Sequence, residues 1–441
     1  MRFLISINKY IKNTIYRLFR VSKMGFMLAL GSAACLGTEK FLVIPILLTI
    51  LDDSKVGHFV WLLAIARIFG RFASGGVSDC LMRLYTKALE DGVWPALVRR
   101  GTELTILISV VSVLIAGIFY LFFDSRSSIA DKLVMVIPLG IYLSLLSGRV
   151  VLNTFFRVEL QFGKIALLDL LSAAGLLLAI PLSVRYELTG LSFAYAVSSL
   201  LGIGASIIIL RKHIQKFEVK IGDWNRRLLT AAPIFALTSM MGVAYYQAGR
   251  IILGIYRPYS EVIVFFAAES IVAVVMMPMV YISGVIYSFV SRKDIFKENQ
   301  QTIVSQHIVC CLISAVGLYF IINLTGAYLL PVFFSGQAEA ALVLLKILSI
   351  GGAMKALFMF SRAFIYKYST YRVIILFTAS SFILNISLLF ALTPIYGLKG
   401  ASWAVTGSNI YIAILWFGAY ISMCFLNYGK TSTEANLSFS E

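Results

Sequence analysis

The sequence predicts an all-α polytopic membrane protein, with about twelve transmembrane helices in two six-helix halves around a central cavity. Three observations lead to this fold class. The 441 residues are 60% hydrophobic and only 13% charged, whereas a soluble domain carries about 25% charged residues. Apolar runs of membrane-spanning length recur along the whole chain. Lysine and arginine gather in alternate gaps between those runs.

The apolar runs approach or exceed the roughly 20 residues that a helical span needs. The gaps between them are short, and the longest polar breaks are 79–102 and 211–227, so no soluble domain fits between spans. The predicted spans lie near 24–51, 57–78, 103–123, 133–155, 166–184, 188–210, 228–256, 262–288, 303–325, 338–362, 372–393 and 398–425.

The basic segment 211–227 divides these spans six and six. The expected organisation is therefore a first half over 24–210, a cytoplasmic linker over 211–227 and a second half over 228–425. Two halves that rock around a site near the middle of the membrane are a common plan among transporters.

The two chain ends differ from the spans in composition. Residues 1–23 interleave six cations with apolar side chains at helical spacing, which predicts an amphipathic helix on an anionic cytoplasmic leaflet. A frayed basic tail is the alternative. Cations recur throughout, and no small-residue cleavage site is present after them, so the segment does not match a signal peptide. Residues 426–441 form a polar tail, for which we expect disorder.

The distribution of cations predicts which loops face the cytoplasm. The N-terminal segment, the tail and one alternate set of loops hold 25 lysines and arginines, whereas the other set of loops holds 6. Loops rich in lysine and arginine stay in the cytoplasm. The sequence therefore predicts about twelve spans, with both chain termini cytoplasmic.

Seven cations remain inside the predicted spans, where acidic residues are fewer. An arginine or lysine at a helix centre costs about 2.5–3.5 kcal/mol on the insertion scale. Complete internal pairing is impossible unless some cations reach an interface. The excess of positive charge favours an anionic substrate in a cationic cavity. The cations are Lys40, Arg67, Arg71, Arg149, Arg250, Lys346 and Lys355, and the deep acids are Glu39, Asp169 and Glu269.

Arg67 and Arg71 lie four residues apart in the second predicted span, so they share one helix face. If the arginines belong to a substrate site, this helix face borders a cavity that holds water or an anion. The alternative is that both arginines pair with carboxylates elsewhere and only brace the helix bundle.

Motifs of soluble enzymes are absent from the sequence. It contains no phosphate-binding glycine loop, no nucleophile elbow and no helical zinc motif. The five cysteines lack metal-site spacing, and no metal or other cofactor is expected. The net charge of +17 has its explanation in the cytoplasmic loops, so nucleic acid is not an expected partner. A transporter, a channel and a membrane-embedded transferase remain, and the sequence does not indicate an enzyme.

Short motifs along the chain resemble one transporter group. Spread over nearly the whole sequence, they resemble the polysaccharide flippase branch, of the O-antigen (Wzx-like) type, of the multidrug/oligosaccharidyl-lipid/polysaccharide exporter superfamily. Many relatives have an acidic residue directly before the arginine of the seventh span, where this chain has Gly249. The matching segments are 45–57, 75–83, 232–233, 249–256, 267–271 with Pro278, and 331–336.

The resemblance implies a flippase in the bacterial inner membrane. It would move an undecaprenyl-diphosphate-linked oligosaccharide to the outer leaflet for O-antigen or capsule assembly, with membrane lipid and polysaccharide assembly proteins as further partners. The coupling ion, H⁺ or Na⁺, is left open, as is transport driven by the membrane potential alone. In such folds spans 1, 2 and 7 line the cavity. The implied substrate-binding residues are Lys40, Arg67, Arg71 and Arg250, and the candidate gating or ion-pair residues are Glu39 and Glu269.

A gate is predicted where Arg250 and Glu269 lie at similar depth in neighbouring spans. We expect the two to pair when no substrate is bound, and the diphosphate to compete for Arg250 during transport. The alternative is that Glu269 faces a different span and meets Lys40. Tyr245, Tyr246 and Tyr281 could stack on sugars or serve only in packing.

Two other function classes stay open. A multidrug or cation antiporter of the same superfamily would need acidic residues in its cavity, whereas cations prevail here. A membrane glycan polymerase or ligase also uses arginines against lipid diphosphates, but it usually carries a long external loop.

Overall fold

The computed structural model describes residues 31, 34–123, 129–214, 222–292 and 300–426. Every regular element in this described part is helical, and nine of its helical segments are long and apolar enough to cross a membrane. The helices are η1 (Thr38–Val43), α2 (Ile44–Ile50), α3 (Asp53–Glu90), α4 (Trp94–Phe123), α5 (Ile129–Val158), α6 (Phe162–Leu176), α7 (Ala179–Ile214), α8 (Gly222–Tyr256), α9 (Tyr259–Arg292), α10 (Gln300–Phe333), η3 (Ser335–Gln337), α11 (Ala338–Tyr368) and α12 (Tyr371–Leu426).

Two of these helices reverse direction within their bounds. In α7 the backbone of Glu187 has φ 49° and ψ −130°, and in α12 that of Gly397 has φ 57° and ψ −132°. Residues eight apart in a straight helix are separated by about 12 Å. A Cβ on Gly190 would instead lie 2.2 Å from the carbonyl oxygen of Leu182, so the chain has turned back on itself. With both reversals counted, the described helices make twelve passages, as the sequence predicts.

The two reversals are copies of one another at a spacing of 210 positions. A Cβ on Gly400 would lie 2.1 Å from the carbonyl oxygen of Leu392, as Gly190 does with Leu182. Only glycine allows this close approach of two backbones. The repeat extends along the chain, which supports two halves of common design. Its identical pairs include Leu182 and Leu392, Tyr186 and Tyr396, Leu188 and Leu398, Gly190 and Gly400, Ser192 and Ser402, Ala194 and Ala404, and Ser198 and Ser408.

Contacts between loops gather the helix ends into two opposite groups. Gln337 Nε2 donates to Asp53 Oδ2 at 2.9 Å, and Lys55 Nζ to Glu187 Oε2 at 2.9 Å. These residues lie in loops predicted to face outward. At the other end Tyr85 bonds to Glu159, and Arg100 bonds to Asn225, in loops predicted to be cytoplasmic. The alternation of the loops is therefore confirmed, while the side of the membrane that each group faces stays a prediction.

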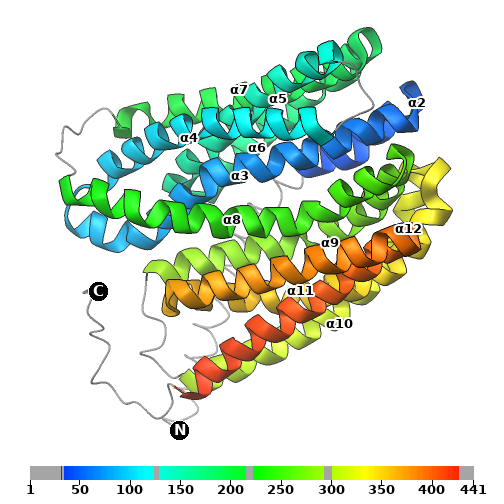
Figure 1. Cartoon of the computed structure of the whole chain (residues 1–441). Coiled ribbons are helices and arrows are strands. Elements are labelled where there is room, and N and C mark those ends of the chain that lie inside the picture. The colour runs from blue at the N-terminus through cyan, green and yellow to red at the C-terminus, as the bar shows by residue number, and fades with distance from the viewer. Residues whose placement is uncertain (1–30, 32–33, 124–128, 215–221, 293–299, 427–441) are drawn as a thin grey trace.

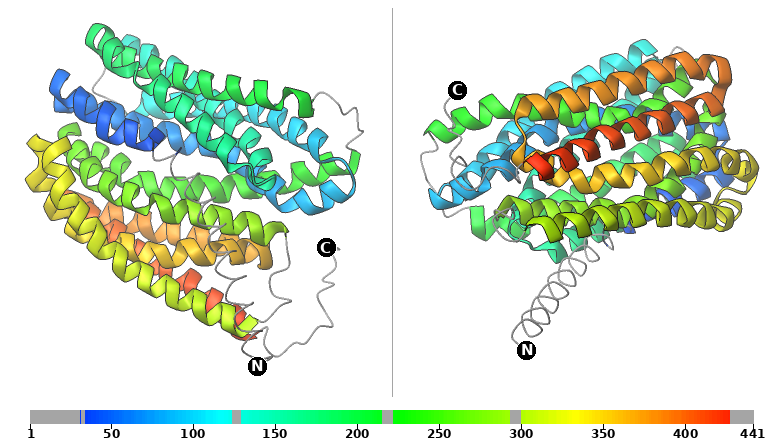
Figure 2. Two further views of the ribbon diagram at one scale, coloured as in Figure 1. Left: turned by 180° about the vertical axis from the view of Figure 1, so that it is seen from behind. Right: turned by 90° about the horizontal axis from the view of Figure 1, so that it is seen from below.

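The two halves meet along α3 and α8, which lie side by side between them (Figure 1). Trp61 Nε1 of α3 donates to the carbonyl oxygen of Ile251 in α8 at 3.1 Å, and the rings of His58 and Tyr259 stack at 4.8 Å. At this predicted outer end a single hydrophobic core contains residues of both halves. At the other end one core joins the first half to the start of α8, through Leu228, Ala232 and Phe235, and another core belongs to the second half alone. The two layers are visible from behind in Figure 2.

Several helices extend beyond the apolar runs that predicted them. The break expected over 79–102 is mostly helical, because α3 continues to Glu90 and α4 begins at Trp94. Charged residues are good helix formers once outside the bilayer; Arg99 and Arg100 both pair with Glu103 one turn away. The expected linker 211–227 is likewise helical up to Ile214 and from Gly222 onward. The predictions for 1–23 and for the tail after 426 lie outside the described residues.

Candidate substrate site

Glu39 and Lys40 lie in one wide turn of the first span. The segment η1 is wound as a π-helix, and the backbone N–H of Ile44 bonds to the carbonyl oxygen of Glu39. Pro45 comes directly after it and has no N–H to offer to the preceding turn. Such π-turns are frequent at functional sites. The turn sends the two side chains to different neighbours, Glu39 to α3 and Lys40 to α9.

Lys40 and Arg250 converge on the ring of Phe266. The Nζ atom of Lys40 lies 5.2 Å from the ring centroid, and the guanidinium carbon of Arg250 lies 4.8 Å from it. Both cations are buried, at 4% and 2% exposure. An aromatic face attracts a cation without neutralising its charge. The site therefore concentrates positive charge inside the bundle.

Glu269 is the carboxylate of this centre. Arg250 donates from Nε to Glu269 Oε2 at 2.7 Å, and from Nη1 to Gln247 Oε1 at 3.3 Å. The pairing of Arg250 with Glu269 predicted from span order is confirmed, and among the described residues Lys40 makes no ion pair with Glu269. Two basic side chains therefore share one carboxylate here. The Glu269 side chain is 22% exposed, so an incoming ligand can approach the pair from that side.

Arg67 and Arg71 share a face of α3 but meet different acids. Arg67 Nη2 donates to Glu39 Oε2. Arg71 Nη2 lies 3.9 Å from Asp79 Oδ2, and Ser239 Oγ donates to the same oxygen at 2.7 Å. Both arginine side chains are partly exposed, at 16% and 26%. Their contact with a substrate stays a prediction, as does the alternative that they brace the bundle.

The remaining charges inside the spans leave lysines uncompensated. Arg149 pairs with Asp169 and also donates to Ser172 Oγ. Lys346 is exposed on α11. Among the described residues Lys40 and Lys355 make no ion pair. The three deep carboxylates, in contrast, each have an arginine partner, and so does Asp79 near the span end: the deep ones are Glu39, Asp169 and Glu269.

Sequence reasoning counted Arg362, the last residue of the predicted span 338–362, with the cytoplasmic cations, and did not choose Lys355 as a substrate residue. In the structure α11 continues to Tyr368 and carries both residues. Lys355 Nζ lies 3.7 Å from the ring centroid of Tyr246 in α8. Their spacing of seven, two helical turns, was the available signal.

The other predicted aromatic residues have mixed outcomes. Tyr245 donates to Asn409 Oδ1 at 2.9 Å and is buried, so it packs within the second half. Tyr246 is partly exposed and faces Lys355. The side chain of Tyr281 lies outside the described part of the structure.

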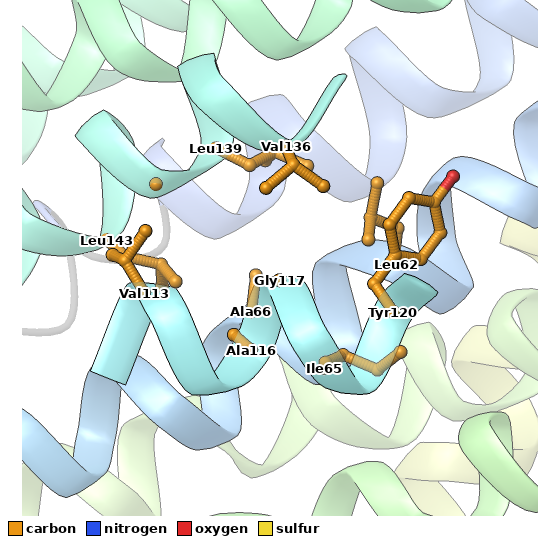
Figure 3. A pocket seen from close by; sticks show the side chains of 11 residues that line it. Leu62, Ile65, Ala66, Val113, Ala116, Gly117, Tyr120, Val136, Leu139 and Leu143 are labelled. Atoms are coloured by element: carbon orange, nitrogen blue, oxygen red, sulfur yellow. The ribbon is translucent and has the colours of Figure 1, made fainter. Parts of the chain in front are cut away.

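A small apolar pocket lies elsewhere, between α3, α4 and α5 of the first half (Figure 3). No charged side chain lines it, so it is not the predicted cationic cavity. Its lining residues are Leu62, Ile65, Ala66, Val113, Ala116, Gly117, Tyr120, Val136, Leu139, Gly140 and Leu143.

Solved structures share this fold over nearly the whole chain. An outward-facing multidrug resistance MATE family transporter of the MOP superfamily matches with a TM-score of 0.70 and 15% identity, covering 93% of this chain and 97% of that one. An inward-facing multidrug resistance MATE family transporter matches with a TM-score of 0.59 and 12% identity, covering 93% and 96%.

A MOP superfamily transporter from Pyrococcus furiosus matches with a TM-score of 0.69 and 13% identity, covering 93% of this chain and 96% of that chain. That protein is described as having a binding pocket of reverse polarity, which suggests a different function. No protein-family model and no curated protein matches the sequence. The chain therefore has the fold of MATE family transporters of the MOP superfamily.

Proposed function

We propose that this protein is a transporter that moves an anionic, lipid-linked substrate across the membrane. The substrate class that fits is an undecaprenyl-diphosphate-linked oligosaccharide, as the sequence resemblance implies. Its diphosphate would bind at Lys40 and Arg250, its sugars would occupy the space between the halves, and its isoprenoid tail would stay in lipid. The proposed setting is the bacterial inner membrane.

One observation carries this proposal: Glu39, Asp79, Asp169 and Glu269 all have arginine partners, whereas Lys40 and Lys355 make no ion pair among the described residues. A cationic ligand would need a free carboxylate in the span. A cation held only by an aromatic ring keeps its charge for an anion. The uncompensated lysines therefore favour a phosphate-bearing ligand over a cationic drug.

The Arg250–Glu269 pair is the proposed gate. Its 2.7 Å contact joins α8 to α9 on either side of a short loop. Position 249 is a glycine and offers Arg250 no acid, so Glu269 is the acid available to it. A Cβ added at position 249 would lie 3.0 Å from the ring of Phe265. A diphosphate has more negative charge than one carboxylate, so it would compete for the guanidinium in a charge-assisted, bidentate contact.

The deciding experiment tracks the lipid-linked intermediate in cells with and without the protein, using a label that reaches only the outer surface. We expect labelled intermediate when the protein is present, and intermediate trapped inside when it is absent. Equal labelling in both strains would overturn the proposal. Single repeat units displayed outside without the protein would instead indicate a polymerase or ligase.

A charge swap tests the gate within the same assay. Glu269→Gln and Arg250→Gln should each impair export. Arg250→Glu combined with Glu269→Arg should restore membrane abundance but not full transport, because the swap moves the cation away from its substrate position. Full activity and abundance of Glu269→Gln would exclude a role for the pair.

The second candidate is a multidrug antiporter, favoured by the fold of its structural neighbours. Efflux of a cationic dye such as ethidium distinguishes the two. Protein-dependent efflux that is lost in Glu269→Gln, together with unchanged labelling of the lipid-linked intermediate, would establish the antiporter. The absence of dye efflux together with protein-dependent labelling would establish the flippase.

A further inference from the structure

One face of α11 carries two cations that the site at Lys40 does not use. Lys355 and Arg362 are seven residues apart, so two helical turns bring them onto the same side. Both side chains are partly exposed, and both residues lie within α11 and not in the loop after it. At 1.5 Å rise per residue they stand about 10 Å apart along the membrane normal.

Each of these cations lies over a tyrosine ring. Lys355 Nζ is 3.7 Å from the centroid of Tyr246, and the guanidinium carbon of Arg362 is 4.7 Å from that of Tyr366. Lys355 makes no ion pair among the described residues, so its charge is held but not cancelled. A lysine at this depth is costly unless an anion or water meets it.

The position of Tyr246 shows which helix the Lys355 side of α11 faces. Tyr246 belongs to α8, the helix that packs against α3 of the first half. The contact between Lys355 and Tyr246 therefore lies on the side of α11 that faces α8, the helix that joins this half to the first. Arg250 lies four residues beyond Tyr246 in α8, or about 6 Å closer to the predicted outer end.

These cations form a series from the predicted cytoplasmic end toward the Lys40 centre. Arg362 comes first, Lys355 with Tyr246 next, and Arg250 with Lys40 over Phe266 last. Lys355 thus stands between the cytoplasmic end of α11 and the gate pair. Along the helix axes the series advances about 10 Å from Arg362 to Lys355 and about 6 Å from Tyr246 to Arg250.

We propose that Lys355 and Arg362, with Tyr246, form a second anion-binding position, where the diphosphate of the substrate docks before it reaches Lys40 and Arg250. This inference rests on the proposed function and adds its loading step. The ligand is a diphosphate, bound by charge and by donation from the ammonium and guanidinium groups. The ring of Tyr246 orients the ammonium group of Lys355 toward that ligand.

The experiment measures binding to the full-length protein in detergent, from the rise in melting temperature on adding ligand. The probes are farnesyl diphosphate, farnesol and inorganic pyrophosphate. We expect the diphosphate lipid to stabilise the parent and farnesol to have no effect. A response to pyrophosphate alone would assign the position to a free diphosphate and overturn the lipid-linked substrate.

Substitutions then test the second anion-binding position. Lys355→Gln and Arg362→Gln should each weaken farnesyl diphosphate binding about ten-fold, the loss of one charge-assisted contact. Tyr246→Phe, which keeps the ring, should bind like the parent. The matched control is Lys346→Gln, which removes a cation from the exposed side of the same helix. If a Gln variant folds poorly, Arg362→Lys replaces it and should retain binding within about three-fold.

The outcomes distinguish this inference from the proposed function. If the parent binds farnesyl diphosphate while Lys355→Gln and Arg362→Gln bind as tightly as the parent, the second position does not exist and the transporter proposal stands. If the parent binds no diphosphate at all, the proposed function itself fails.

Discussion

The buried arginines of the first half and the cations on α11 of the second half are held in different ways, whereas Lys40 of the first half lies over an aromatic ring, as the cations on α11 do. In the first half Arg67, Arg71 and Arg149 each meet a carboxylate. In the second half Lys355 and Arg362 lie over tyrosine rings.

Arg250, at the seam, has both kinds of neighbour, Glu269 and Phe266. The comparison teaches that the number of cations in a span says little about where positive charge is available. A carboxylate cancels the charge of its partner, whereas an aromatic ring positions a cation and leaves it charged. We infer that the first half uses its arginines mainly to join helices, and that the second half presents charge to an anion.

The largest expected effect tests the bracing role in the first half. Arg149→Leu removes the arginine that the half-buried carboxylate of Asp169 meets, so it should cost about 3 kcal/mol in stability and remove most folded protein. The double variant Arg149→Leu with Asp169→Leu should recover most of that loss, because apolar side chains can replace a buried pair. Melting temperature in detergent and yield of monodisperse protein measure both. A stable single variant would show that the pair does not join α5 to α6.

Arg67 tests whether bracing and binding can be separated. Arg67→Ala strands the carboxylate of Glu39, so it should lower stability by about 3 kcal/mol and reduce transport through lower abundance. Arg67→Lys keeps the charge but loses the planar fork, and it should retain part of both. Transport is compared per folded molecule. A normal abundance with abolished transport would instead assign Arg67 to the substrate and break the comparison of the halves.

Arg71 is the first-half arginine that we expect to depart from the pattern. Its contact with Asp79 is long, 3.9 Å, and its side chain is 26% exposed, so Arg71→Ala should cost about 1 kcal/mol or less. If the diphosphate reaches it, transport should still fall about ten-fold. Export assays at matched membrane abundance give the result. Full restoration of export by Arg71→Ala would show that this arginine only joins helices, as Arg149 does.

The smallest expected effect is at Lys346. Its side chain is exposed on α11, away from the two positions on the other face. Lys346→Gln should change stability by no more than about 0.5 kcal/mol and leave transport unaltered. A clear loss of export in this variant would mean that charge anywhere along α11 matters, and would remove the distinction between faces.

Much of the candidate site was predictable because charge in a membrane span is rare and costly. Arg250 and Glu269 could be paired from span order alone, since a short loop makes α8 and α9 neighbours. The place of Arg362 inside a helix was missed, because hydropathy ends the span where the charge begins, while the helix continues to Tyr368. The pairing of Arg67 with Glu39 also could not be predicted, because it depends on a π-turn that the residue pattern does not indicate.

The sequence by itself determined the fold class, the number of passages and the alternation of loops. The physical reason is that each span must satisfy its own backbone hydrogen bonds and present apolar side chains to lipid, which leaves a local signal in the chain. Only the tertiary structure decided which cation meets a carboxylate and which lies on a ring. That choice depends on helix rotation and on side chains more than a hundred positions apart, such as Tyr246 and Lys355, brought within 3.7 Å by packing.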